Sequence, residues 1–440
     1  MTPEIKQALM SADPYAHHLL DKPVRPLLRA YVRAVLETMA LTLIPIWIAM
    51  PFFWGCLYSM PSHMNGLDAM VVNHDQNGLV GTGIVDSLIR QNSLPPQMHL
   101  TYFVTDPSEY RTNQEVENAI ASEKAWVSII VSQQLTKRLD TAWDNGDATW
   151  DPRQAMTVVY NSGRHSDATR SILLPLVQQA LSEAVRATAS QALQDYLQRR
   201  GNTLSQLVNA PNTITTPLSW NMHDVRPADA SAAQATTFVG LIYVLILAFI
   251  FVIRVSFSKG WYGSKLKLRS YLLVRLLAPA IYYFFIAWAF SLLSLAFRVP
   301  FSRRIRGGFL AYWAIVWYGM IILGGLMELV ASLVGLPYTA FFMVSFIVIN
   351  NSVSLWPFEV LHPFFRFGYA MPFFNLRQAF LTLIFNTKSH MGRNLGVLAA
   401  WLVVIYSGLF ALTIWERRRA NTGPGSTGPR GKDLEKGNSA

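Results

Sequence analysis

AVLETMALTLIPIWIAMPFFWGCLY, residues 34–58, is an apolar run that contains a single charged residue, Glu37. At about 1.5 Å per residue, a helix of this length crosses the roughly 30 Å hydrocarbon core of a bilayer. Some 33 residues precede it, many of them polar or basic, and the run is too long for a cleaved signal peptide. We therefore expect it to remain as a membrane anchor.

Five more segments have the same character. The chain is 52% hydrophobic and only 14% charged, against about 25% charged residues in average soluble domains. The sequence therefore predicts a polytopic α-helical membrane protein with six transmembrane helices in a 1+5 arrangement. The six predicted spans are 34–58, 236–255, 271–297, 309–334, 338–356 and 395–415.

The net charge of +11 is distributed unevenly. Residues 61–235 hold 12 Lys and Arg against 17 Asp and Glu, so the segment between the first two spans is acidic. The basic excess belongs to the membrane part of the chain. This distribution favours contact with membrane lipid and argues against nucleic-acid binding.

Three basic clusters flank the spans, and Lys and Arg concentrate on the cytoplasmic side of membrane proteins. They predict a cytoplasmic N-terminal segment at 1–33, an extracytoplasmic domain at 59–235 and a cytoplasmic tail at 416–440 that is too polar to order. The membrane would be a plasma membrane or an endomembrane. The clusters are Lys6, Lys22, Arg25, Arg29 and Arg33; Arg254, Lys259, Lys265, Lys267 and Arg269; and Arg417, Arg418 and Arg419.

Two other basic segments fit the rule less simply. Arg298, Arg303, Arg304 and Arg306 lie between the third and fourth spans, on the predicted outer side, and so oppose it. Residues 24–33 space three arginines four apart. That spacing suits an interfacial helix on the inner membrane surface and equally a solvated flank of the first span.

The segment between the first two spans alternates strand and helix patterns. Strand-like runs stand at 70–75, 98–104, 126–131 and 156–161, and helical patterns follow them at 79–91, 112–124, 132–143 and 167–199. Such alternation is typical of an α/β domain with a partly parallel sheet. The polar, proline-containing residues after Gly201 indicate a return linker to the second span.

No catalytic or nucleotide-binding motif occurs in the sequence. It contains no G-x-x-x-x-G-K-[ST], H-E-x-x-H or G-x-S-x-G, and no two of its nine histidines are spaced i, i+4. The lone Cys56 excludes an intramolecular disulfide. We therefore expect a protein that is not an enzyme, with no catalytic, cofactor-binding or metal-binding residues and no ATPase site of its own.

Two ionisable residues are expected inside the spans, where a charge is costly unless it is paired or hydrated. Arg275 lies about one turn inside the cytoplasmic end of the third span, and Glu328 about two turns inside that of the fourth. Their similar depth predicts an ion pair. The pair is either a contact that ties two helices together or a proton or substrate site.

The stretch 356–392 is aromatic and broken by prolines, which argues against a straight span. We expect a re-entrant or interfacial hairpin on the outer side, because backbone polar groups at membrane depth must be buried in protein or line a cavity. The hairpin either shapes an exit portal for amphiphiles or forms an aromatic belt at the interface. Its charged or titratable candidates are Glu359, His362, Arg366 and Arg377.

Several runs form an ordered set of motifs along the chain: MVVNHDQNGLVG (70–81), AFRVPF (296–301), GGFLAYWAIVWYGMIILGGLMELV (307–330), INNSVSLWPFEVLHPFFRFGYAMPFFNLRQAFLTLIF (349–385) and GRNLGVLAAW (392–401), with Arg226-Pro227 before the second span. In these runs the sequence resembles the fungal nitrosoguanidine-resistance family of membrane proteins. That family is similar in layout to type-2 ABC exporter permeases and phage-infection-protein-like proteins, with one span, a large outer domain and five more spans. The resemblance covers most of residues 34–415 and implies a transport-like role.

The resemblance carries over onto Glu328 and onto a set of hairpin positions, with no chemical role attached to any of them. The basic group at 303–306 departs from the family pattern. The hairpin positions are Asn350, Pro357, Glu359, Gly368, Tyr369, Pro372 and Asn375.

These features lead to two hypotheses. The first is a permease-like, multi-pass fungal membrane protein that acts in export of, or resistance to, toxic amphiphilic compounds, or in lipid distribution. It would contact membrane lipid and an amphiphilic small molecule, form a homodimer, and depend on a separate ATPase subunit or an ion gradient. The second is a membrane-anchored structural or signalling protein whose outer domain binds a partner.

The predicted threading has a direct test. In sealed vesicles with the cytoplasmic face outward, protease should leave residues 61–235 intact and remove the tail 416–440, because only the tail is expected on the accessible side. Immunoblotting with tags in both segments measures this, and detergent lysis is the control. Cleavage within 61–235 before lysis would show that the threading is inverted.

Overall fold

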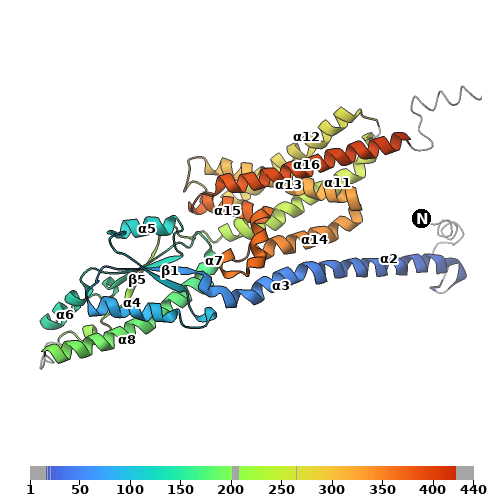
Figure 1. Ribbon diagram of the computed structural model, residues 1–440. Coiled ribbons are helices and arrows are strands. Elements are labelled where there is room, and N and C mark those ends of the chain that lie inside the picture. Colours follow the sequence, from blue (N-terminus) through green and yellow to red (C-terminus); the bar gives the residue numbers. More distant parts are fainter. Residues whose placement is uncertain (1–15, 17, 20, 201–207, 264, 423–440) are drawn as a thin grey trace, which may run out of the picture.

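The computed structural model of the chain describes residues 16, 18–19, 21–200, 208–263 and 265–422. Figure 1 shows a domain built on a β-sheet, residues 67–230, that lies end to end with a helical bundle, residues 235–422. We call these parts the sheet domain and the bundle. A long helical segment at the start of the chain runs along one side of the bundle.

The sheet domain contains one five-stranded sheet with the strand order β2-β1-β3-β4-β5. β1 pairs in parallel with β2 and β3, β3 pairs antiparallel with β4, and β4 pairs in parallel with β5. The strands are β1 Asp68–Asn73, β2 Thr101–Thr105, β3 Val127–Val131, β4 Met156–Tyr160 and β5 Trp220–Asp224. The first four overlap the predicted strands, whereas β5 lies in the segment that was interpreted as a return linker.

Helices cover both faces of this sheet. Ala69 and Val71 of β1 pack with α4, α6 and α8, while Met70 and Val72, which point the opposite way, pack with α5. Figure 1 shows α5 on one side of the sheet and α4 with α8 on the other. The helices and turns are α4 Leu79–Gln91, η4 Pro96–Met98, α5 Asn113–Ala121, α6 Leu135–Asn145, η5 Pro152–Gln154, α7 Ser166–Ala168, η6 Thr169–Leu173, α8 Leu174–Arg200 and α10 Asn212–Thr215.

The bundle is organised around α13, whose buried residues pack with those of α11, α12, α15 and α16. Gly324 of α13 lies so close to α12 that a Cβ atom there would be 2.1 Å from Tyr283 Oη. Small residues at such crossings let transmembrane helices approach closely. The bundle helices are η7 Ala235–Val239, α11 Gly240–Tyr262, α12 Leu268–Ala296, α13 Gly308–Val334, α14 Leu336–Ser352, α15 Pro372–Phe385 and α16 Met391–Thr422.

Five helical segments in the described part of the chain are long and apolar enough to cross a membrane, where the sequence predicted six. They are Lys22–Gly66, Ala235–Ser258, Leu268–Ala296, Gly308–Val334 and Met391–Arg419. The predicted span 338–356 is the shorter helix α14, whose 17 residues extend about 25 Å, less than the hydrocarbon core. The apolar run continues to Trp356, but Pro357 disfavours a helical residue before it.

The first helical segment also starts earlier than predicted. Residues 25–33 are continuous with the rest of α2, because no proline or glycine interrupts this helix between Pro26 and Pro45. Their place at the inner membrane surface stays a prediction. No residue of α2 is buried, and Figure 1 shows it running apart from the bundle, whereas η2 and α3 pack against α14. The segment consists of η1 Lys22–Val24, α2 Arg25–Ile44, η2 Pro45–Ala49, α3 Met50–Ser59 and η3 Met60–Gly66.

At the other end of the chain, α16 continues to Thr422, so residues 416–422 are helical where disorder was predicted. The rest of that predicted tail, 423–440, lies outside the described residues. Arg417 donates to the carbonyl oxygens of Gly263 and Leu266 at 2.7 and 2.8 Å, which ties the end of α16 to the α11–α12 connection. Cations near a helix C-terminus also interact favourably with the helix dipole.

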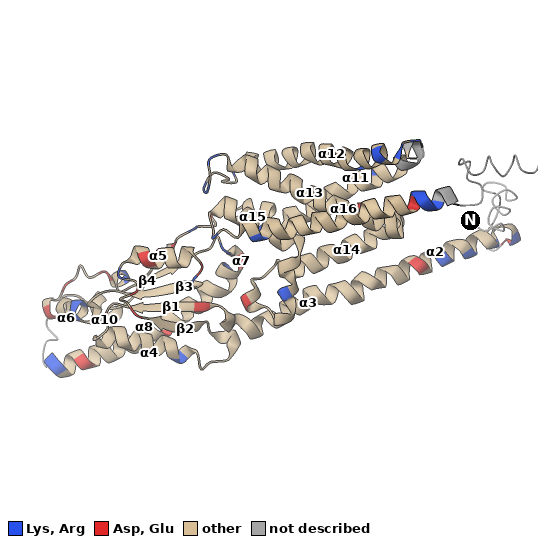
Figure 2. Ribbon diagram, turned by 45° about the horizontal axis from the view of Figure 1, so that its top comes forward, with Lys and Arg blue, Asp and Glu red and all other residues tan. Residues whose placement is uncertain are grey.

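Charged residues divide between the two ends of the bundle. Figure 2 shows Lys and Arg on α2, α12 and α16 at the end remote from the sheet domain, so the described parts of the three predicted cytoplasmic clusters share one end. The 298–306 group lies at the sheet-domain end. There Arg303 pairs with Asp229 at 2.6 Å, and Arg304 donates to Asn386 Oδ1 at 3.1 Å. Arg303 and Arg304 therefore bind other protein groups, whereas Arg298 and Arg306 are exposed.

The predicted hairpin region consists of two short turns and a helix at the sheet-domain end of the bundle. The turns η8 Phe358–Val360 and η9 Pro363–Ala370 precede α15. Pro363 and Pro372 each stand at the first position of an element, where the missing N–H has no helical partner to lose.

A glycine fixes the approach of the first helical segment to this region. A Cβ atom on Gly66, at the end of η3, would lie 1.9 Å from the carbonyl oxygen of Glu359. We expect Gly66→Ala to lower the free energy of unfolding by about 1–3 kcal/mol, as overpacking against backbone does. Thermal unfolding of the detergent-purified protein measures the loss. Gly392→Ala is the control, because no atom lies within 4 Å of its Cβ position.

Candidate functional site

A polar pocket with a cavity volume of about 150 Å³ lies where the sheet domain meets the bundle. We call it the junction pocket. From the sheet domain it is lined by Glu123, Trp126, Arg164 and His165. From the bundle it is lined by Ser354, Trp356, Pro357, Phe358, Glu359, Tyr369, Phe374, Arg377, Gln378, His390 and Arg393.

The antiparallel pairing of β3 and β4 positions the sheet-domain side of the pocket. Trp126 precedes β3 and Arg164 follows β4, so both lie at the sheet edge that faces the bundle. The Arg164 guanidinium stacks on the Trp126 ring, 3.6 Å from its centroid. Its Nη2 lies 2.8 Å from Oε1 of Glu359 in η8. Arg164 therefore joins the two parts of the molecule.

A second contact across the junction joins Arg377 of α15 to His165. Nη1 of Arg377 lies 3.0 Å from Nε2 of His165 and also donates to the Ser354 carbonyl oxygen. Only 5% of Arg377 and 4% of His165 is exposed. Burial lowers the pKa of Arg377 to about 10, so its guanidinium remains charged at neutral pH.

His165 is neutral at physiological pH. Burial first, and then the charges of Arg377 and Arg164, lower its pKa well below the ordinary value. A guanidinium only donates, so the contact with Arg377 requires an unprotonated Nε2. Nδ1 faces the backbone N–H of Ala168 at 3.3 Å, and because a neutral imidazole accepts at one nitrogen only, the two contacts compete.

Two carboxylates and a third arginine border the same pocket. Oε2 of Glu123 lies 3.5 Å from Nε2 of His390, while Glu359 is engaged by Arg164. The Arg393 guanidinium lies 5.5 Å from the centroid of the Tyr369 ring. With the histidines counted as neutral, three arginines face two glutamates, so the lining carries a net positive charge.

The structure brings together four of the ten hairpin candidates taken from the sequence. Pro357, Glu359, Tyr369 and Arg377 all line the junction pocket. The other six lie outside it and are Asn350, His362, Arg366, Gly368, Pro372 and Asn375.

Two of those six are asparagines that hold the turn before α15. Asn350 Oδ1 accepts from the backbone N–H of Phe373 at 3.2 Å, and Asn375 Nδ2 donates to the carbonyl oxygens of Tyr369 and Met371. Both side chains therefore bind the backbone around the start of α15.

The other four candidates shape the local backbone or are exposed to solvent. His362 Nδ1 accepts from the N–H of Phe364 at 3.2 Å, and Gly368 packs against Val353. Pro372 begins α15, and Arg366 is exposed.

Arg164 and His165 were missed by the sequence analysis. The available signal was their position directly after the predicted strand 156–161, a common place for functional side chains. Nothing local indicates that this strand runs antiparallel to β3, and so the sequence does not show that its end faces the membrane part.

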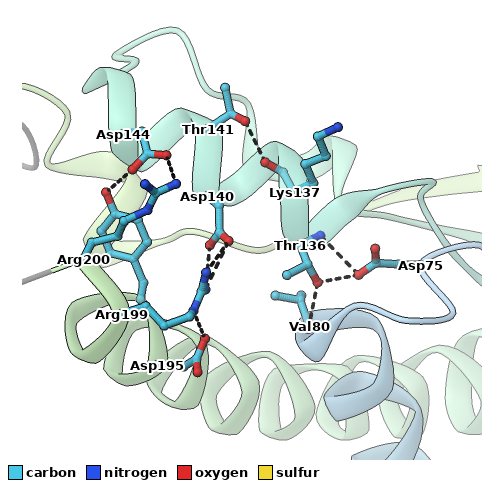
Figure 3. A network of polar contacts seen from close by, with 11 residues as sticks. Asp75, Val80, Thr136, Lys137, Asp140, Thr141, Asp144, Asp195, Arg199 and Arg200 are labelled. Carbon is cyan, nitrogen blue, oxygen red and sulfur yellow. Dashed lines mark hydrogen bonds and ion pairs between the residues drawn. The ribbon is translucent and has the colours of Figure 1, made fainter.

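A second polar network lies in the sheet domain, at the ends of α6 and α8 (Figure 3). Asp75 Oδ2 accepts from Thr136 Oγ1 at 2.6 Å and from the backbone N–H of Gly81 at 3.1 Å. Arg199 of α8 pairs with Asp140 of α6 at 3.1 Å. These contacts connect α4, α6 and α8, and among the described residues no group of three or more His, Cys, Asp or Glu side chains could hold a metal ion.

Comparisons with known proteins place the chain. A family model described as "Protein of unknown function (DUF3533)" matches residues 38–407. The chain belongs to this family. It is also 25% identical over 382 residues to an uncharacterized endoplasmic reticulum membrane protein of Saccharomyces cerevisiae, across 80% of this chain and 74% of the relative. No solved structure matches.

Together with its apolar helices, these relationships make the chain a polytopic helical membrane protein. The DUF3533 match takes in every lining residue of the junction pocket, from Glu123 to Arg393. It also takes in both predicted intramembrane charges.

Those two charges meet inside the bundle of this DUF3533 chain. Arg275 Nε lies 2.7 Å from Glu328 Oε1, and each residue is 7% exposed. Arg275 also donates to Ser332 Oγ at 2.9 Å and to Thr413 Oγ1, so one guanidinium connects α12, α13 and α16. The Glu328 carboxylate is engaged by a permanent cation. These contacts therefore favour the interpretation that the pair ties helices together over the interpretation that it is a proton site.

We expect Glu328→Gln to destabilise the bundle by about 3–5 kcal/mol, since it leaves the buried Arg275 without its carboxylate. Thermal unfolding in detergent measures the loss. Glu37→Gln is the matched control, because Glu37 pairs with Arg33 on an exposed helix face, where an ion pair contributes little. A normal unfolding temperature combined with lost resistance to toxic compounds would instead identify Glu328 as a proton carrier.

Proposed function

We propose that this protein binds amphiphilic molecules in the junction pocket and moves them between the bilayer and the compartment that contains the sheet domain. One observation carries the proposal: an arginine-lined pocket lies between the α/β sheet domain and a bundle of apolar helices. A site at such a boundary offers polar groups to one end of a molecule and hydrocarbon to the other.

The bundle side of the pocket supports this proposal. Phe358, Tyr369 and Phe374 line it and contact one another, with ring centroids 4.3 Å apart for Phe358 and Tyr369 and 4.8 Å for Phe358 and Phe374. An aromatic rim beside arginines suits a ligand with one apolar and one charged end. We therefore propose that the hairpin region forms a portal for amphiphiles, and not an aromatic belt that only anchors the protein at the membrane interface.

We also propose that α14 is a sixth crossing. Only Gly335 separates it from α13, so it turns back, and its Asn350 reaches α15 at the sheet-domain end. With six crossings both ends of the chain lie on the side of the basic clusters, which the charge rule assigns to the cytoplasm. The sheet domain would then face a lumen or the cell exterior.

The biological role that fits this activity is resistance to toxic amphiphiles or the distribution of lipids, as the resemblance to the nitrosoguanidine-resistance family implies. The endoplasmic reticulum location in the name of the yeast relative supports an endomembrane. Without a phosphate-binding loop in the sequence, uphill transport would need an ATPase subunit or an ion gradient. We propose a non-enzymatic protein that works as a homodimer.

Reconstitution tests the function. Proteoliposomes should move a fluorescent phospholipid between leaflets faster than protein-free liposomes, as measured by chemical quenching of the outer leaflet. Gln378→Trp, which would fill the junction pocket, should lower the excess rate at least about tenfold. The matched control Gln178→Trp lies on the exposed face of α8 and should leave the rate unchanged. An excess rate that Gln378→Trp leaves intact would refute movement through this pocket.

The competing role as a membrane-anchored binding protein gives the opposite result in cells. Residues 61–235 on an unrelated single-span anchor should fail to restore resistance if the bundle moves molecules. Restoration by that chimera would instead assign function to the sheet domain alone.

A further inference from the structure

The junction pocket has more hydrogen-bond donors than its own acceptors use. In the part of the chain that the structure describes, five buried polar side-chain atoms without a partner belong to residues that line it. Four of these can only donate, because they belong to indole or guanidinium groups. The five atoms are Trp126 Nε1, Arg164 Nη1, Ser354 Oγ, Trp356 Nε1 and Arg377 Nε.

The charges around the pocket, like its unused donors, favour an anionic ligand. Among the described residues no carboxylate forms an ion pair with Arg377, whose polar contacts are a neutral imidazole and a carbonyl oxygen. Glu359 forms an ion pair with Arg164, and Glu123 lies beside His390. Asp167 interacts with this guanidinium only at longer range. A buried cation whose direct partners are dipoles is costly to hold, and an anion would offset that cost.

Size limits what can enter. A cavity needs a volume of only about 10–15 Å³ to hold one water molecule. The junction pocket, at about 150 Å³, therefore admits a group of several heavy atoms but not a pair of long acyl chains. A phosphate group fits this volume and can accept from guanidinium and indole donors at once. The apolar part of an amphiphile would remain outside, towards the aromatic rim.

We infer that the junction pocket binds one oxyanion, the phosphate of an amphiphile head group, between Arg164 of the sheet domain and Arg377 of the bundle. The inference rests on the proposed function, since it names the head-group class that the proposed site accepts. The free Nη1 of Arg164 and the free Nε of Arg377 supply the charged donors, and the Trp126 and Trp356 indoles supply neutral ones. An oxyanion between two guanidinium groups would also link the two parts of the molecule.

Binding to the purified full-length protein in detergent tests this inference. Dihexanoyl phosphatidic acid should bind saturably, and dihexanoylglycerol, which has the same chains without the phosphate, should not. Arg377→Gln and Arg164→Gln should each weaken binding about tenfold or more, because each removes charge-assisted donors. Arg306→Gln removes an exposed arginine at the same end of the bundle, outside the pocket, and should have no effect.

Two further measurements make the result decisive. If Arg377→Gln does not yield folded protein, Arg164→Gln carries the test, since Arg164 is less deeply buried. Inorganic phosphate should compete with the phosphatidate if the pocket also takes free phosphate, and should fail to compete if it requires the whole amphiphile. Equal binding of both dihexanoyl compounds, or wild-type affinity in Arg164→Gln, would overturn the inference.

The inference and the proposed function can fail separately. Normal phosphatidate binding without movement of lipid in proteoliposomes would refute transport and retain the anion site. Lipid movement that depends on the pocket, without phosphatidate binding, would refute the anion site alone.

Discussion

Arg377 is a permanent cation in the protein interior, and the junction between the sheet domain and the bundle is arranged around it. Moving such a group out of water costs several kcal/mol even after relaxation. The compensating dipoles come from separate parts of the chain: the Ser354 carbonyl from the segment after α14, and His165 from the turn after β4. The Phe238 ring of η7 lies 5.4 Å away. Ser354 and Phe238 belong to the bundle itself, so docking of the sheet domain adds the His165 contact to them.

Arginines recur along this junction for the same reason. Arg226, at the end of the sheet domain, donates to the carbonyl oxygen of Asn386, and Arg304 donates to the side chain of the same asparagine. Arg303 reaches Asp229. A guanidinium has five donors in a planar fork and can satisfy exposed carbonyl oxygens and carboxylates where two parts of a chain meet. Arginines at such a docking surface bind other protein groups, so they do not indicate on which side of the membrane a loop lies. Arginines on a loop without such partners do indicate that side.

The elements that the sequence predicts well are those with a strong periodic or compositional signal. Spans are long and apolar, and β1 to β4 carry alternating or continuous apolar residues, so each is visible locally. β5, with the sequence WNMHD at 220–224, is an edge strand of mostly polar residues, and its only signal is its partner β4. The 338–356 run was overestimated because hydropathy does not register where a helix ends: α14 ends at Ser352, although the apolar residues continue to Trp356.

Only the bundle side of the pocket could be predicted from the sequence, because the two sides of the pocket are far apart along the chain. Glu359 and Arg377 stand out as charges within an aromatic, proline-broken stretch. Their partners Arg164 and His165 are 195 and 212 residues away, in a domain whose orientation depends on strand pairing. Spacing along the chain contains no information about that pairing, so the arginine cluster appears only once the sheet is docked.

The two most buried arginine sites of the bundle differ in how their charge is balanced, and that difference separates a structural site from a binding site. Arg275 has a carboxylate and two hydroxyl groups as partners and sits among three helices. Arg377 has no carboxylate at ion-pair distance among the described residues, keeps an unused Nε, and lines a cavity that other unused donors share. A balanced buried charge has nothing further to gain from a ligand. An unbalanced charge beside open volume gains both charge neutralisation and hydrogen bonds from an anion, which fits Arg377 to a binding site and Arg275 to a structural one.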